Sequence, residues 1–124
     1  MPTITLPLPD GTTSGHAKGH WRSAAKTTKA MREYAWGECF QIKGHPSKPY
    51  AKAIIHFAFF LASNRRRDTL NLMHGCKAYI DGIVDAGIIA DDDWKTLSVG
   101  EATVSVDRDN PRVEITIVEA KRGK

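Results

Sequence analysis

A run of twelve residues, "AKAIIHFAFFLA" at positions 51–62, constrains the fold of this chain more than any other segment. Apart from Lys52 and His56 it is apolar at both odd and even positions, and it is rich in β-branched and aromatic residues. Such a run is typical of a strand that lies inside a sheet, with a neighbour on each side. We therefore expect a central strand here.

Three weaker strand patterns surround this central one. At the N-terminus Ile4, Leu6 and Leu8 alternate with other residues until the turn sequence at 9–11. Two further strand candidates lie within 97–106 and at 113–118, and the turn "DRDNP" joins them. The chain therefore carries enough strands for a small sheet.

Two helices are expected between the strands. The first has Ser23 as its N-cap and runs to about Phe40. The second starts at Asp68 or Thr69, either of which could cap it, and ends at Gly87, a favourable C′ residue. Its apolar stripe consists of Leu72, Cys76, Tyr79, Ile80 and Ile83.

The order β-α-β-α-β-β predicts an α+β fold, in which a single two-layer domain over residues 1–124 packs two main helices on a mixed sheet. A chain of 124 residues is long enough to bury a core without disulfides. Cys39 and Cys76 have no metal-like spacing and are expected in the core. The chain has no apolar run of membrane-spanning length and no charged, cleavable N-terminal segment, so we expect a cytoplasmic protein with no membrane partner.

The net charge of +4 is distributed unevenly along the chain. Residues 1–67 contain eleven Lys/Arg and three Asp/Glu, whereas residues 68–124 contain seven Lys/Arg and eleven Asp/Glu. A basic first half suggests nucleic acid as a partner, with the acidic residues kept for another purpose.

Two acidic clusters flank the second predicted helix. Asp68 opens it, and Asp91, Asp92 and Asp93 follow it after the hydrophobic segment 88–90. If the chain turns back along the helix after this segment, one of the three aspartates approaches the Asp68 end. The sequence alone does not establish that return.

Converging aspartates would suit Mg²⁺, which prefers oxygen ligands, keeps several waters and bridges to phosphate. Asp68, Asp92 and the metal would then orient a water for attack on a phosphodiester. Two groups of basic residues would hold the flanking phosphates. They are Arg65, Arg66 and Arg67 before the helix, and Lys18, Arg22, Lys26 and Lys29 in the N-terminal part.

Each of these residues also has an ordinary structural explanation. Three acids before Trp94 are typical of a solvated loop. Lys77 and Asp81 lie four residues apart and can form a surface ion pair, or Lys77 can be directed at a phosphate. Asn71 is either a polar residue of the first helical turn or a residue that orients Asp68.

The segment "RRRDTLNLMHGCKAYIDGIVDAGIIADDDW" resembles the core of the RusA-type endodeoxyribonucleases, the Holliday junction resolvases of bacteria and their phages. The shared pattern is a basic run, Asp, two residues, Asn-Leu, a helix with Lys and Asp-Gly, then Ala-Gly and a closing Asp-Asp. About thirty residues carry this pattern strongly. The N-terminal strand, the first helix and the final strand fit the family layout more loosely.

The resemblance implies a cytoplasmic homodimer, in a bacterial cell or a phage-infected host, that binds four-way DNA junctions and nicks two strands symmetrically in DNA recombination and repair. The implied cofactor is Mg²⁺, with Mn²⁺ as a substitute. By position, Asp68 and Asp92 are the two metal-binding aspartates, with Asp91 and Asp93 as neighbours. Lys77 matches a lysine near the scissile phosphate, and Asp81 matches a supporting helix aspartate.

One departure from the family pattern concerns the metal site. The family commonly shows Asp-x-Asp-Asn, and the second aspartate is replaced here by Leu70. Asp91 or Asp93 could take the vacant ligand position, activity could persist with water there, or the chain could bind junctions without cutting them. The longer spacing from Asn71 to Lys77 also implies a different start of the helix. An active nuclease is our interpretation; the alternatives are a silent branched-DNA-binding protein and a small interaction protein with solvated charges.

Overall fold

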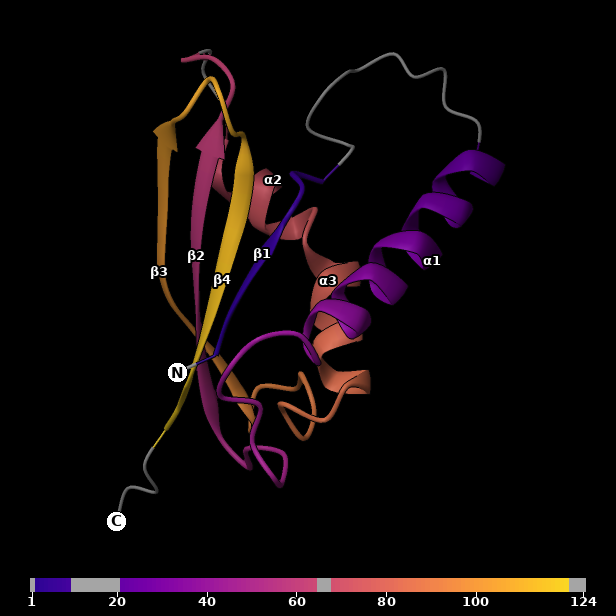
Figure 1. Cartoon of the computed structure of the whole chain (residues 1–124), viewed down its shortest axis with the longest axis vertical. Coiled ribbons are helices and arrows are strands. Elements are labelled where there is room, and N and C mark those ends of the chain that lie inside the picture. Colours follow the sequence, from indigo (N-terminus) through magenta and orange to yellow (C-terminus); the bar gives the residue numbers. More distant parts are fainter. Residues whose placement is uncertain (1, 10–20, 65–67, 121–124) are drawn as a thin grey trace.

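The computed structural model describes residues 2–9, 21–64 and 68–120, with the side chains of residues 21–27 excepted. Figure 1 shows an α+β domain in which a four-stranded sheet carries its helices on one face. The predicted two-layer fold with a mixed sheet is confirmed. In chain order the elements are β1 (Thr3–Leu6), α1 (Trp21–Glu38), β2 (Ala53–Leu61), α2 (Thr69–His74), α3 (Lys77–Asp85), β3 (Leu97–Val106) and β4 (Arg112–Glu119).

The sheet has the strand order β1-β4-β2-β3. β2 pairs with β4 in the antiparallel direction and with β3 in the parallel direction, so the strand predicted as central does lie inside the sheet. β3 and β4 do not form a hairpin, although the short turn at 107–111 joins them, because β2 lies between them. The turn itself forms as expected, since the Asp107 carboxylate accepts a hydrogen bond from the Asn110 N–H at 3.2 Å.

The core lies between the sheet and the helix layer. On β2 the alternate residues from Ala53 to Leu61 are buried, and the residues between them are half-buried. β4 shows the same alternation, with Val113, Ile115 and Ile117 fully buried. The helices therefore cover only one face of β2, although this strand is apolar on both faces. Its other face is half-buried because β2 lies between two neighbouring strands.

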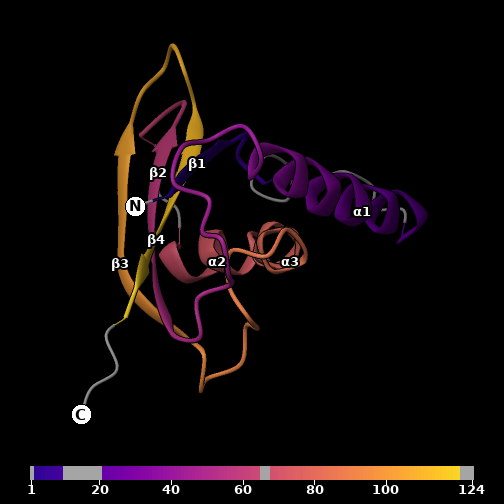
Figure 2. The same ribbon diagram turned by 60° about the horizontal axis from the view of Figure 1, so that its bottom comes forward.

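α1 packs closely against α3 (Figure 2). Gly82 of α3 lies against α1 so tightly that a Cβ at this position would collide with the Arg32 carbonyl oxygen and meet the Ala35 Cβ at 3.0 Å. The Arg32 guanidinium donates two hydrogen bonds to the Asp85 carboxylate, at 2.6 and 3.0 Å. The prediction that Ser23 caps the first helix is wrong, because α1 already includes Trp21 and Arg22.

The second predicted helix consists of two helices, α2 and α3, with a break at Gly75 and Cys76. Gly75 is a weak helix former, and it leaves room for Pro9, whose Cβ would lie 3.1 Å from a Cβ at this position. The end of the segment is as predicted: Gly87 adopts φ +85°, which a residue with a side chain rarely does. Among the described residues no helix has both the length and the apolar character needed to cross a bilayer.

Candidate functional site

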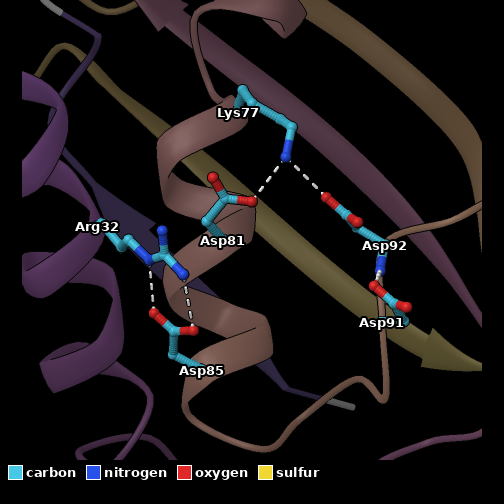
Figure 3. Close-up of polar contacts among 6 residues, drawn as sticks. All are labelled: Arg32, Lys77, Asp81, Asp85, Asp91 and Asp92. Atoms are coloured by element: carbon cyan, nitrogen blue, oxygen red, sulfur yellow. Dashed lines mark hydrogen bonds and ion pairs between the residues drawn. The ribbon is translucent and has the colours of Figure 1, made fainter.

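The side chain of Lys77 joins two carboxylates at the start of α3 (Figure 3). Its Nζ donates to Asp81 Oδ1 at 2.6 Å, one turn further along the helix, and to Asp92 Oδ2 at 2.8 Å, in the loop before β3. The Lys77 side chain is 62% exposed, whereas those of Asp81 and Asp92 are 27% and 31% exposed. The surface pair Lys77–Asp81 is therefore present as the helical spacing predicts, and it is extended by an aspartate fifteen residues away.

This arrangement favours the charged forms of Lys77 and Asp92. The hydrogen bond to Asp81, followed by the one to Asp92, raises the pKa of Lys77 above its ordinary value. The hydrogen bond from Lys77 lowers the pKa of Asp92. Lys77 is consequently an ammonium at neutral pH, so it can attract a phosphate or developing negative charge but cannot accept a proton as a general base.

The return of the chain toward the start of α3 depends on the segment before β2. After Gly87 the residues Ile88 and Ile89 are buried. The Tyr50 backbone holds this segment, since its N–H donates to the Ile88 carbonyl at 2.9 Å and its carbonyl accepts from the Ala90 N–H at 3.0 Å. The hydrophobic residues between α3 and the acidic triplet thus anchor the chain, and the triplet emerges beside Lys77.

The outer two aspartates of the triplet bind their own backbone. Asp91 Oδ1 accepts a hydrogen bond from the Asp92 N–H at 2.7 Å (Figure 3). Asp93 Oδ1 accepts from the Thr96 N–H at 3.0 Å and shapes the turn that leads into β3. These are the local turn contacts typical of aspartate in a loop, and each carboxylate keeps a second oxygen for another ligand.

Asp68, the first predicted metal ligand, acts as the N-cap of α2. Its Oδ1 accepts the Leu70 N–H at 3.0 Å, which selects Asp68 over Thr69 as the capping residue. Asp68 and Asn71 are both exposed, and no hydrogen bond joins their side chains, so an orienting role of Asn71 is not observed in this described segment. Leu70, which replaces the usual second aspartate, has 72% of its surface exposed.

The two acidic clusters do not form one group in the described part of the chain. Asp92 lies beside Lys77 at the start of α3, and the six residues of α2, about 9 Å of helix, separate Asp68 from that point. No set of three or more His, Cys, Asp or Glu side chains gathers as metal ligands among the described residues. The predicted ligands Asp68 and Asp92 thus have different partners among the described residues, the Leu70 N–H and the Lys77 ammonium.

Mg²⁺ fits the residues present as a hydrated ion and not as an ion in a closed protein cage. It commonly binds one or two carboxylates and takes its remaining ligands from water and substrate phosphates. Asp92 is the best-placed carboxylate, with Asp91 next to it, and both belong to an exposed part of the loop. The Lys77 ammonium already occupies the space between Asp81 and Asp92, so these two cannot share an ion while Lys77 binds both.

The basic residues predicted to hold DNA are described only in part. Lys18 and the three arginines Arg65, Arg66 and Arg67 lie outside the described residues. Arg22 and Lys26 belong to α1, but their side chains are outside the described set, and Lys29 is exposed on the same helix. His56 of β2 has a backbone partner: its Nδ1 accepts the Glu101 N–H at 2.9 Å, on the sheet face away from the helices.

Two contacts near the site were missed by sequence reasoning. Lys77–Asp92 and Arg32–Asp85 each join residues that are far apart in the sequence, and no spacing rule predicts them. For the Lys77–Asp92 contact, the sequence signal is the acidic triplet 91–93, which follows the hydrophobic residues Ile88 and Ile89. No protein-family model matches the chain, and no curated protein shows significant similarity to it.

Proposed function

We propose that this chain is a Mg²⁺-dependent, structure-selective endodeoxyribonuclease that resolves Holliday junctions and other branched DNA by paired nicks, acting as a homodimer in DNA recombination and repair. The proposal rests on the RusA-like sequence pattern at 65–94 and on the geometry around Lys77. Its substrate is a phosphodiester at the branch point, recognised mainly by the shape of the DNA.

The contact between Lys77 and Asp92 is the observation that carries this proposal. In the family pattern the whole of α3 lies between the lysine and the closing Asp-Asp. The fold nevertheless brings Lys77 Nζ and Asp92 Oδ2 to 2.8 Å from one another. A surface lysine that merely needed a partner already has Asp81 at 2.6 Å. The second carboxylate supports a site in which a cation for the phosphate and an anion for the metal lie side by side.

In the proposed reaction each residue of the site has a distinct task. The Lys77 ammonium attracts the scissile phosphate, and its raised pKa keeps it charged throughout the neutral range. Asp92, with a lowered pKa, remains an anionic oxygen ligand, and Asp91, Asp93 and Asp68 are the further carboxylates of the pattern. When bound, Mg²⁺ supplies Lewis acidity and an activated water. The basic side chains of the first half hold the neighbouring phosphates, so binding should weaken steeply with salt.

A synthetic four-way junction tests the proposal directly. Purified protein is incubated with the junction in Mg²⁺, in Mn²⁺ and in EDTA, and nicks are separated from binding by denaturing and native gels. We expect symmetrical nicks with either metal, and retention without nicks in EDTA. Failure to retain the junction at moderate salt would contradict the proposal and favour an interaction protein with solvated charges.

A catalytically silent branched-DNA-binding protein is the second candidate, and a specific observation favours it. Leu70 stands exposed at the position of a usual metal ligand, and Asp68 and Asp92 belong to separate clusters in the described conformation. In that case the same experiment gives junction retention in EDTA but no nicks with either metal.

A further inference from the structure

β3 is the longer of the two edges of the sheet. It has ten residues, pairs with β2 on one side, and has no described strand on the other (Figures 1 and 2). The opposite edge, β1, has four residues, and its exposed side chains are Thr3 and Thr5. An edge strand presents unpaired backbone N–H and C=O groups, so β3 has the greater capacity to accept another strand.

β3 also presents apolar side chains that the helix layer does not cover. Val99, Val104 and Val106 are 55%, 40% and 43% exposed. They pair in register with Ile55, Phe59 and Leu61, three buried core residues of β2, and so lie on the helix side of the sheet. Exposed edges of monomeric proteins are commonly protected by charges or proline, and β3 contains no proline and a single charge, that of Glu101.

A bulge divides β3 into two halves. The register with β2 shifts between Ile55 and Phe57, so two residues of β3, Gly100 and Glu101, lie opposite His56 alone. His56 fixes this irregularity, because its Nδ1 accepts the Glu101 N–H and a Cβ at Gly100 would collide with its ring. As a result the helix-side residues change from odd to even positions along the strand: Leu97 and Val99, then Ala102, Val104 and Val106.

We propose that β3 is the homodimer interface of this chain, and that it pairs antiparallel with β3 of a second copy around a two-fold axis between Gly100 and Glu101. Two-fold symmetry places the first half of one strand opposite the second half of the other. Because Gly100 and Glu101 both lie opposite His56, on the face away from the helices, this register sets each residue from Leu97 to Val104 opposite a residue of the same face. Leu97 then lies opposite Val104 of the second copy, and Val99 opposite Ala102.

Neighbouring registers lack this complementarity. A shift of one residue sets helix-side residues such as Val99 opposite outward-facing ones, and a shift of two sets Glu101 opposite Ala102 or Val99 opposite Gly100, which lie on opposite faces. In the proposed register Glu101 lies opposite Gly100 and not opposite its own copy, so the only charges of the two strands are not directly paired.

The charges next to the strand ends favour the same orientation. Residues 94–96, before β3, carry one positive charge from Lys95, and residues 107–110, after it, carry a net negative charge from Asp107, Arg108 and Asp109. An antiparallel pair brings the first segment of one copy toward the second segment of the other. The occupant that fits this edge is therefore a second copy of the chain.

This inference rests on the proposed function, because it names the surface through which the homodimer forms. It is tested without DNA or metal, so a failure of the β3 interface can be distinguished from a failure of the nuclease function. Sedimentation velocity of the full chain is measured over two orders of magnitude in concentration. We expect a monomer–dimer equilibrium that Val104→Lys shifts at least tenfold toward the monomer. Thr5→Lys, which adds the same charge to the opposite edge, is the matched control and should leave the equilibrium unchanged.

A cross-link tests the register itself. In the double variant Leu97→Cys/Val104→Cys, mild oxidation should give a disulfide-linked dimer, whereas Leu97→Cys/Thr103→Cys, which pairs opposite faces, should not. The native Cys39 and Cys76 are buried and do not compete. A chain that is monomeric at every concentration overturns the proposal, as does a dimer that neither Val104→Lys weakens nor the first cysteine pair traps.

Discussion

Lys77 and Asp92 form an ion pair of 2.8 Å across a separation of fifteen residues, and Asp81 shares the same ammonium. The pair connects the start of α3 to the loop that precedes β3. It is solvent-accessible, since more than half of the Lys77 side chain is exposed. Charged residues at an accessible site of this kind can contact a substrate.

The first prediction concerns the charge of Lys77. Lys77→Met should lower the rate of junction nicking by about a hundredfold, the effect of losing one electrostatic contact to the reacting group. Junction retention in EDTA should change little, because many other cations bind the backbone. Lys95→Met is the matched control: it removes an exposed lysine of the same loop that lies over Trp94, and it should leave the nicking rate within severalfold of the wild type. Equal losses in both variants would refute a specific role for Lys77.

The second prediction separates the charge of Asp68 from its capping role. Asparagine caps a helix about as well as aspartate, so Asp68→Asn should keep the hydrogen bond to the Leu70 N–H and the stability of α2. It should nevertheless abolish nicking and leave junction binding intact. Asp68→Ala removes both functions and should also lower the free energy of unfolding by about 1 kcal/mol, measured in urea. Lost binding in Asp68→Asn would make Asp68 an architectural residue.

The third prediction uses the exposed position of Leu70. Leu70→Asp restores the acid that the family pattern carries, in the first turn of α2, where a negative charge is favourable. Because Leu70 is 72% exposed, the substitution should not lower stability. If the native site lacks a ligand, nicking should rise about tenfold, or about 1.4 kcal/mol of barrier, at limiting Mg²⁺. Leu70→Asn is the uncharged control, and an equal increase there would exclude a metal effect.

The fourth prediction tests the contact between α1 and α3. Gly82→Ala should destabilise the protein by about 1–3 kcal/mol, because the new Cβ would collide with the Arg32 carbonyl and the helices must separate. Gly37→Ala is the control within α1. A Cβ at Gly37 meets nothing within 4 Å, so alanine should stabilise the helix by about 0.5–1 kcal/mol. Urea unfolding of both variants measures the two opposite effects.

The fifth prediction is a dependence of stability on pH at the same helix contact. The hydrogen bond from Arg32 lowers the pKa of Asp85 below its ordinary value of 3.8. The unfolded chain therefore binds a proton at Asp85 before the folded chain does, so the pair stabilises the fold above about pH 4 and loses this effect as pH falls through the lower folded pKa. In thermal melts at pH 6, the melting temperature of Arg32→Gln should be lower than that of the wild type. The difference in melting temperature should disappear in strong acid. Because both side chains are exposed, the difference should also be small and should decrease with added salt.

Much of the fold could be predicted because its signals are local. The strand at 51–62, the alternation of Ile4 and Leu6, and the stop at Gly87 each depend on residues within a few positions of one another. The errors arose where tertiary packing decided the outcome. Ser23 lies inside α1, not at its cap. The second helix breaks at Gly75, where Pro9 from the N-terminal strand region packs against it.

The sequence by itself determined where the strands and the helical segments lie, which residues form the apolar stripe of α2 and α3, and that a lysine and an acidic triplet lie at the two ends of α3. These properties follow from the periodicity of side chains along a strand or a helix. Only the tertiary structure decided that Asp92 binds Lys77, that Asp68 lies apart as a helix cap, and that β3 is an edge strand with exposed valines. The reason is physical: such contacts depend on how separate elements dock, through the Tyr50 backbone and the close approach at Gly82, and no spacing along the chain encodes that docking.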